Sequence, residues 1–296
     1  MKCVTRLLCV AHSLVFSLSS FATDSEEVLT SIDSRAQQLT DLSDHIWDLA
    51  EVGYQEILSS NALKEALLTE GFSIESGVAS IPTAFVASYG SGQPVIAIMG
   101  EFDALPGISQ AAVPVVQKID GKKAAHACGH HLFGAGSAGA AIAVKEWLDR
   151  TESSGTVQFF GTPAEEGGSG KVYMVRAGLF DNVDTVIHWH PASVNSADSA
   201  STLANRSAKF TFTGVSSHAA SAPERGRSAL DAVESMNFMV NLLREHVPSS
   251  TRLHYVITNG GATPNVVPNT AESFYYVRHP NENALRDIWD RVVATA

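Results

Sequence analysis

Apolar residues between positions 41 and 202 alternate between strand-like and helix-like spacing. Short apolar runs bounded by turn residues predict buried strands, and apolar residues three or four positions apart predict helices. The predicted strands are 84–89, 95–99, 156–160 and 184–189, and a hairpin-like turn at 90–94 joins the first two. The predicted helices are two within 43–70, then 134–148 and 171–177. Because strands alternate with helices, we expect an α/β layer with a largely parallel sheet.

The pattern changes near Leu203. From there the spacing predicts strand, helix, strand, strand and helix, at 207–213, 227–245, 252–258, 271–278 and 283–296. This order is one strand short of a split βαβ, ferredoxin-like unit. We therefore expect a first domain at 23–202 and a second, incomplete domain at 203–296. Because no closing strand follows, the sequence is interpreted as part of a longer protein.

Residues 1–22 differ from the rest of the chain. Lys2 and Arg6 precede an apolar run, and Ser20-Phe-Ala22 offers small residues where a signal peptidase cuts. This pattern predicts a secretory signal and a periplasmic or secreted protein without a membrane span in its mature form, with an uncleaved anchor as the alternative. Cleavage would leave Cys128 as the single cysteine, which excludes an internal disulfide.

Bulk composition narrows the function classes. The chain of 296 residues is 45% hydrophobic and 17% charged, which is typical of a soluble globular protein. Its formal net charge of -11 argues against nucleic acid as a partner, because phosphate binding needs a basic surface.

Residues that bind metals follow the predicted strands or precede a predicted helix. They are Asp103, His126-Ala-Cys128-Gly-His130-His131, Glu165-Glu166 and His188-Trp-His190. In open α/β sheets, ligands bind beyond the carboxyl ends of the strands, so these segments are expected to converge. One thiolate, several imidazoles and paired carboxylates fit a cluster of divalent metals with a general base beside it.

The spacing within each segment suggests how the side chains divide their roles. Cys128 and His130 are two positions apart, so both can project toward one centre. Glu165 and Glu166 are adjacent and diverge, so one carboxylate can bind metal while the other faces a water molecule. Each segment also has an ordinary interpretation, as a buried structural Cys-His pair or as a solvated acidic loop. His188 and His190 both remain candidates.

Taken together, the ordered motifs resemble the dinuclear-metal aminoacylase and carboxypeptidase family. The resemblance runs from about Asp41 to the end of the chain. The motifs are Gly100-Glu-Phe-Asp-Ala-Leu-Pro106, His126-Ala-Cys-Gly-His130, Gly161-Thr-Pro-Ala-Glu-Glu-Gly-Gly-Ser-Gly-Lys171, Trp189-His-Pro191, Ser217-His-Ala-Ala220, Gly226-Arg-Ser-Ala-Leu-Asp-Ala232 and Pro264-Asn-Val-Val-Pro268. The resemblance implies a zinc-peptidase-like catalytic domain with a mostly parallel sheet, and an inserted ferredoxin-like lid domain that mediates dimerisation.

The family resemblance also implies roles for individual residues. It implies two divalent ions, Mn²⁺ or Zn²⁺, held by Cys128, His130, Glu166 and one downstream histidine. The Trp-His-Pro pattern favours His190 for that ligand, while a His-x-x-Pro pattern in other relatives favours His188. The remaining implied roles are Glu165 as general base, His218 as oxyanion or substrate ligand, and Asn265 and Arg278 as substrate contacts.

The implied reaction is hydrolysis of the amide bond of an N-acyl amino acid, with an aromatic acyl substrate such as aminobenzoyl-glutamate as the expected example. The implied assembly is a homodimer through the lid, or a heteromer with a related subunit. The family has a further histidine ligand in a C-terminal segment that has no counterpart in this sequence. The alternatives that follow are an inactive metal- or ligand-binding pseudoenzyme and a chain that does not fold stably. A cysteine hydrolase that uses Cys128 and a nearby histidine is a separate enzyme alternative.

Overall fold

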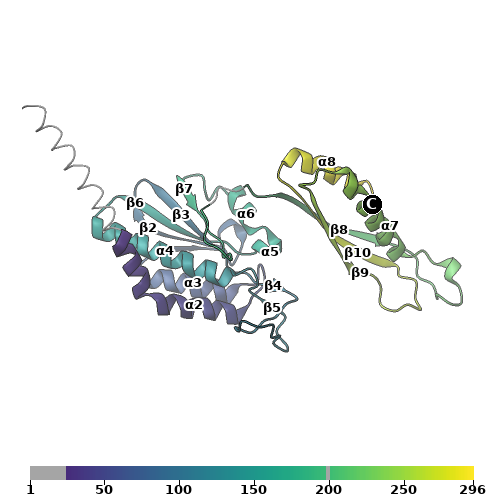
Figure 1. Cartoon of the computed structure of the whole chain (residues 1–296), viewed down its shortest axis with the longest axis horizontal. Coiled ribbons are helices and arrows are strands. Elements are labelled where there is room, and N and C mark those ends of the chain that lie inside the picture. The colour runs from purple at the N-terminus through teal and green to yellow at the C-terminus, as the bar shows by residue number, and fades with distance from the viewer. Residues whose placement is uncertain (1–24, 198–200) are drawn as a thin grey trace, which may run out of the picture. The chain divides into compact units, whose positions relative to one another are not determined.

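The computed structural model describes residues 25–197 and 201–296, so the predicted signal at 1–22 lies outside the described residues. The chain divides into two compact units between Asn195 and Ser196 (Figure 1). The first unit is an α/β layer and the second is a three-stranded sheet with helices.

The sheet of the first unit has five strands and mixed direction. Its order is β1 (Ser73–Ser76), β2 (Phe85–Ser91), β6 (Gly155–Gly161), β3 (Val95–Gly100) and β7 (Thr185–Ile187). The part formed by β6, β3 and β7 is parallel, whereas β1, β2 and β6 pair antiparallel. The predicted hairpin is therefore wrong: the turn after β2 does reverse the chain, but β6 lies between β2 and β3. β3 and β6 pair on both sides, as their continuous apolar sequences indicate.

Helices cover both faces of this sheet (Figure 1). One face packs on α2 (Ala36–Leu49), α3 (Ile57–Thr69) and α4 (His130–Thr151), and the other packs on α6 (Gly170–Arg176). Neighbouring residues of a strand point to opposite faces, so Phe159 joins the first layer and Phe160 the second. Full burial of such a side chain contributes about 1.5–3 kcal/mol to folding.

Strand β7 differs from its prediction as a buried strand. Thr185, Val186 and Ile187 are all exposed, because β7 is an edge strand that pairs only with β3 within the described residues. Four short elements also belong to the unit. They are the paired strands β4 (Leu105–Pro106) and β5 (Ala124–Ala125), the single turn α5 (Glu165–Gly168) and the 3₁₀ turn η1 (Val78–Ser80).

The second unit has the predicted order of elements. They are β8 (Ala204–Thr213), α7 (Ala229–Leu243), β9 (Arg252–Asn259), β10 (Thr270–His279) and α8 (Glu282–Val293), with 3₁₀ turns η2 (Pro223–Arg225) and η3 (Arg244–His246). The sheet order is β8-β10-β9 and both pairs are antiparallel. One face packs on α7 and α8 through Tyr275, Val277, Met236 and Ile288. The Ser228 hydroxyl accepts the N–H of Asp231 and caps α7.

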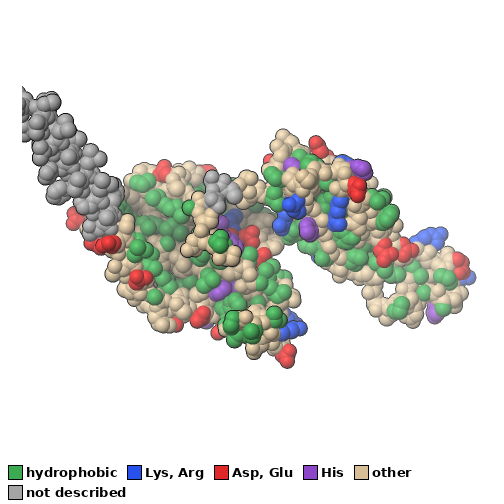
Figure 2. Space-filling model, viewed as in Figure 1, with side chains coloured by type: hydrophobic (Ala, Val, Ile, Leu, Met, Phe, Trp, Pro, Cys, Tyr) green, Lys and Arg blue, Asp and Glu red, His purple; other side chains and the backbone are tan. Residues whose placement is uncertain are grey.

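The surface carries both signs of charge. On the face drawn in Figure 2, acidic side chains outnumber basic ones on the first unit, both signs occur on the second unit, and hydrophobic side chains form separate patches. Among the residues that the structure describes, none of the helices has both the length and the apolar character needed to span a membrane.

Candidate metal centre

Four segments place polar side chains at the carboxyl end of the parallel strands. Glu101 and Asp103 follow β3, and α5 with Glu165 and Glu166 follows β6. The loop after β7 carries His190, and the loop before α4 carries Cys128 and leads into His130. Since β6, β3 and β7 are adjacent and parallel, their carboxyl ends share one edge of the sheet. This is the edge where α/β sheets bind ligands.

Gly129 allows two of these segments to approach each other closely. Its φ of 83° is a left-handed conformation that side chains disfavour. A Cβ at this position would lie 2.9 Å from Cβ of Pro191, which is closer than real contacts allow. The glycine therefore permits both the turn into α4 and the packing of the His190-Pro191 segment against it.

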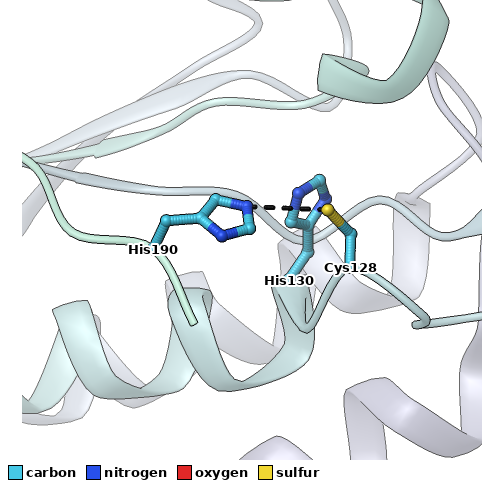
Figure 3. Close-up of side chains that lie close together, drawn as sticks. All are labelled: Cys128, His130 and His190. Carbon is cyan, nitrogen blue, oxygen red and sulfur yellow. Dashed lines mark hydrogen bonds between the residues drawn. The ribbon is translucent and has the colours of Figure 1, made fainter. Parts of the chain in front are cut away.

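Cys128, His130 and His190 come together at this edge (Figure 3). Their Sγ and ring nitrogens all lie within 4.8 Å of one another. The Sγ of Cys128 is 3.6 Å from Nε2 of His190, and the His130 and His190 rings are 5.6 Å apart, nearly perpendicular. One thiol and two imidazoles in this arrangement are a ligand set that zinc and similar ions accept.

Asp103 fixes the orientation of His130. Nδ1 of His130 donates to Oδ1 and to the backbone oxygen of Asp103, each at 3.0 Å. The other carboxylate oxygen of Asp103 accepts the backbone N–H of Glu166 at 3.0 Å. The proton on Nδ1 leaves Nε2 as the ligating atom, as in many metal sites where a carboxylate holds the histidine. Asp103 thus fixes the imidazole of His130 and the α5 turn relative to each other.

Three carboxylates surround Nε2 of His130. Their nearest oxygens lie at 2.8 Å for Glu101, 3.9 Å for Glu165 and 4.0 Å for Glu166. Although Glu101 is close, neither its Oε2 nor Nε2 of His130 completes a well-oriented hydrogen bond, and Oε1 of Glu166 is also buried without one. Buried polar atoms are normally paired. Three buried atoms without a hydrogen bond, beside a thiol and a second imidazole, fit a site for divalent cations.

The electrostatics of this cluster also favour a cation. Burial by itself lowers the pKa of His130, but the carboxylates of Asp103 and Glu101 raise it to about 10. Burial raises the pKa of Glu101, yet His130 and an ion pair with Lys171 lower it to about 2. His130 therefore holds a proton where a divalent ion would compete for Nε2.

Burial and nearby carboxylates raise the pKa of the Cys128 thiol. Burial raises its pKa, and the carboxylates of Glu166, Glu165 and Glu101 raise it further, to about 12. Burial likewise raises the pKa of Glu166. A thiol in this setting stays protonated unless a metal ion binds it, which argues against an activated cysteine nucleophile.

We therefore expect Cys128 of the metal-free protein to react slowly with iodoacetamide at pH 8. A higher pKa reduces the thiolate fraction and only partly compensates through greater nucleophilicity, so the rate should be roughly 50-fold below that of glutathione. Mass spectrometry of the peptide that contains Cys128 measures this rate.

The control for this measurement is Glu166→Gln, which removes the carboxylate with the largest effect on the thiol after burial. This variant should be alkylated faster than the original chain. A wild-type rate equal to that of glutathione would mean that the thiol is activated, and the cysteine hydrolase alternative would return.

The two histidines after β7 occupy different positions. His190 lies beside Cys128, with its Nδ1 3.0 Å from the backbone oxygen of Pro191. His188 is outside the group formed by Cys128, His130 and His190, and its ring packs against Phe133 at 5.0 Å. Burial lowers the pKa of His188. The geometry therefore favours His190 as the ligand from this segment.

The remaining predicted residues lie in the second unit. His218 and Asn265 are on neighbouring loops, where Ala219 donates its N–H to the backbone oxygen of Asn265 at 3.0 Å. Arg278 lies near the far end of β10 and its guanidinium stacks on Tyr276 at 5.3 Å. Since β10 has 10 residues and a strand rises about 3.3 Å per residue, Arg278 and the loop of Asn265 are roughly 30 Å apart. The second unit therefore does not bring Arg278 together with the other two.

Two residues of the site, Glu101 and Lys171, had no role in the sequence prediction, and Asp103 was predicted to lie at the site without a specific role. Glu101 is 2% exposed and Asp103 is 1% exposed, and both contact His130. Lys171 neutralises Glu101. The available signal was the sequence Gly100-Glu-Phe-Asp103 at the end of a buried strand, where charged residues are unusual unless they have partners.

Comparison with known proteins identifies the family of this chain. The sequence model of peptidase family M20/M25/M40 matches residues 97–274, which is more than half of the chain. The chain belongs to this family. It is 46% identical over 267 residues to a subunit of the p-aminobenzoyl-glutamate hydrolase of Escherichia coli, covering 90% of this chain and 56% of the relative. The chain thus spans little more than half the length of that relative.

Solved structures of M20 peptidases and related proteins share the fold. An aminobenzoyl-glutamate utilization protein from Klebsiella pneumoniae has a TM-score of 0.64 at 19% identity, covering 91% of this chain and 73% of that one. A dinuclear metal-binding M20 peptidase from Bacillus subtilis has a TM-score of 0.57 at 24% identity, covering 87% and 68%. The family predicted from the sequence motifs is confirmed, and so is its α/β peptidase fold.

Proposed function

We propose that this M20 chain supplies the metal site of a hydrolase that cleaves the amide bond of N-acyl amino acids. The observation that carries the proposal is the convergence of three buried atoms that lack a hydrogen bond, on Glu101, His130 and Glu166, beside Cys128 and His190. Buried polar atoms are normally hydrogen-bonded, so a group of them without such bonds indicates a ligand site.

Cys128, His130, Glu166 and His190 are the residues that would hold two divalent ions. When bound, such ions polarise a substrate carbonyl and lower the pKa of water. The sulfur, nitrogen and oxygen donors suit zinc and also accept manganese. The peptidase from Bacillus subtilis, which is named as dinuclear, supports the number of ions.

Glu165 is the proposed general base. It begins α5, its side chain is 45% exposed, and its carboxylate lies 3.9 Å from Nε2 of His130. Glu166, the next residue, has a side chain that is only 16% exposed and faces inward. The exposed carboxylate can take a proton from a water molecule at the edge of the site and deliver it to the leaving amine.

His218 remains a predicted oxyanion ligand, and one feature of its ring suits that role. Its Nδ1 accepts the backbone N–H groups of Ala220 and Ser221, both at 3.2 Å. The ring proton is therefore on Nε2, where it can be donated to a developing negative charge.

A dimer through the second unit is part of the proposal. Because Asn265 and Arg278 lie roughly 30 Å apart, a small substrate that contacts both would need them from two copies of the chain. The Escherichia coli relative is named as one subunit of a hydrolase, which supports a heteromer with a related chain as the other arrangement. The periplasmic or secreted location remains a prediction from residues 1–22.

The relatives suggest the class of substrate. The Escherichia coli and Klebsiella pneumoniae proteins are named for aminobenzoyl-glutamate, an aromatic acyl group joined to an amino acid. We extend this class to the present chain, with p-aminobenzoyl-glutamate as the first compound to test.

Removal of metal should abolish hydrolysis of this compound. We expect EDTA dialysis to reduce turnover at least tenfold and added Mn²⁺ or Zn²⁺ to restore it, because the proposed chemistry depends on the ions. The measurement is release of the free amino acid from p-aminobenzoyl-glutamate, benzoyl-glycine and acetyl-amino acids, with metal content determined in parallel.

Two outcomes would contradict the proposal. Turnover that resists chelation but is lost on alkylation of Cys128 would indicate a cysteine hydrolase. Bound metal without turnover of any of these compounds would indicate a metal-binding pseudoenzyme.

A further inference from the structure

Glu56 is a fully buried carboxylate that is not one of the proposed metal ligands. It is 0% exposed and immediately precedes α3. Its Oε1 accepts the backbone N–H of Ala164 at 2.8 Å, and its Oε2 accepts the hydroxyl of Thr83 at 3.1 Å. Burial raises the pKa of this carboxyl group. A polar group so deeply buried needs such partners, so the identity of those partners indicates what it holds in place.

Capping of α3 does not account for Glu56. The side chain occupies the N-cap position but makes no capping hydrogen bond to its own helix. Glu51 does that instead, since its carboxylate accepts the N–H groups of Leu58 at 3.1 Å and Ser59 at 2.8 Å. The carboxylate of Glu56 is therefore directed to Ala164 on a distant segment.

Ala164 is the residue that sets the direction of Glu165. Its φ of 56° and ψ of 44° are left-handed, a conformation that costs a non-glycine residue about 1–2 kcal/mol. The α5 turn that follows has only 4 residues and no side-chain N-cap of its own. So short a turn does not hold itself in place, and its orientation depends on outside contacts.

The segment around Glu56 contacts α5 at both ends. A Cβ on Gly53 would lie 3.1 Å from Cα and Cβ of Ala164, so the backbone there packs directly behind this residue. The hydroxyl of Tyr54 donates to the backbone oxygen of Gly168 at 2.5 Å. The segment 53–56 thus holds the beginning and the end of the turn that carries Glu165.

We propose that Glu56 is a positioning residue for the general base. By accepting the N–H of Ala164, it holds the left-handed residue from which the Glu165 side chain is directed toward the metal site. The proposal rests on the proposed function of Glu165. Misplacement of a catalytic group by about 1 Å can cost on the order of 100-fold in rate.

Three variants of the full chain separate positioning from simple stabilisation. Glu56→Met removes the acceptor for Ala164 and should lower kcat about 10- to 100-fold, with KM and metal content unchanged. Glu56→Gln keeps an amide oxygen for Ala164 and should remain within about threefold of wild type. Thr83→Val removes only the hydrogen bond between Thr83 and Glu56. This variant should retain kcat, although its loss of folding stability should be comparable to that from losing the bond to Ala164.

Hydrogen exchange of the peptide 162–169 provides a measurement that does not depend on catalysis. Exchange should be faster in Glu56→Met than in wild type, Glu56→Gln or Thr83→Val. If Glu56→Met does not fold, Glu56→Ala replaces it with the same expectation, because it also removes the carboxylate acceptor.

The outcomes distinguish this proposal from the proposed function. An inactive wild-type chain would refute the proposed function, and hydrogen exchange alone would then decide whether Glu56 positions α5. Equal exchange in Glu56→Met and wild type would overturn the positioning role. So would equal losses of kcat in Glu56→Met and Thr83→Val, since a general structural effect would then explain both.

Discussion

Glu165→Gln should lower kcat by about 10²- to 10⁴-fold and leave the metal content of the protein unchanged. Glutamine keeps the size and hydrogen-bonding capacity of the side chain but cannot accept the proton of a water molecule at neutral pH. Glu165 is near Glu101 and His130 in one group of possible ligands, but its side chain is 45% exposed and it is outside the group of Cys128, His130 and His190, so its loss should leave that group intact. Steady-state hydrolysis of p-aminobenzoyl-glutamate, with metal measured per chain, tests both parts of the prediction.

Glu166→Gln is the matched control, because the same chemical change falls on the next residue. Its Oε1 is buried without a hydrogen bond and lies 4.0 Å from Nε2 of His130, so this variant should lose metal and lose activity with it. Excess metal should partly restore Glu166→Gln and should not restore Glu165→Gln. Equal metal loss in the two variants, or near-normal turnover of Glu165→Gln, would refute the assignment of base and ligand.

The sheet of the first unit was predictable in its strands but not in its order. The apolar runs at 95–99 and 156–160 fall within β3 and β6, because strands paired on both sides need continuous apolar sequence. The position of β6 between β2 and β3 depends on long-range pairing, which the local turn at 90–94 does not encode. An apolar run alone did not reveal that β7 is an exposed edge strand.

The residues of the site were also only partly predictable from the sequence. Cys128, His130 and the two glutamates could be selected because metal-ligating types at strand ends are unusual locally. Glu101 was harder to assign, since only the fold shows that His130 and Lys171 are its partners. Glu56 could not be assigned from sequence at all, because its key partner is a backbone N–H of a residue 108 positions away. A metal ligand can be recognised from its residue type. A contact to a backbone N–H, such as that of Ala164, can be made by almost any residue and so is not visible in the sequence.

His130→Gln should remove metal from the whole site and reduce turnover below detection. His130 is 0% exposed and belongs to both groups of side chains that could hold an ion, one with Cys128 and His190 and one with Glu101 and Glu165. Loss of its imidazole therefore affects both groups. Metal content after equilibration with Mn²⁺ or Zn²⁺, together with kcat, measures the effect.

His131→Gln is the control for this variant because it changes the adjacent histidine. The ring of His131 packs on Trp47 at 4.8 Å and lies outside both ligand groups, so metal content should stay normal. His130→Gln should also reduce the free energy of unfolding by about 3–5 kcal/mol, because it leaves the buried carboxylate of Asp103 without its cationic partner and Glu101 with Lys171 alone. Thermal melts of both variants in the absence of metal measure this loss of stability separately from metal loss. A folded His130→Gln protein that still binds two ions would contradict the assignment of His130 as a ligand.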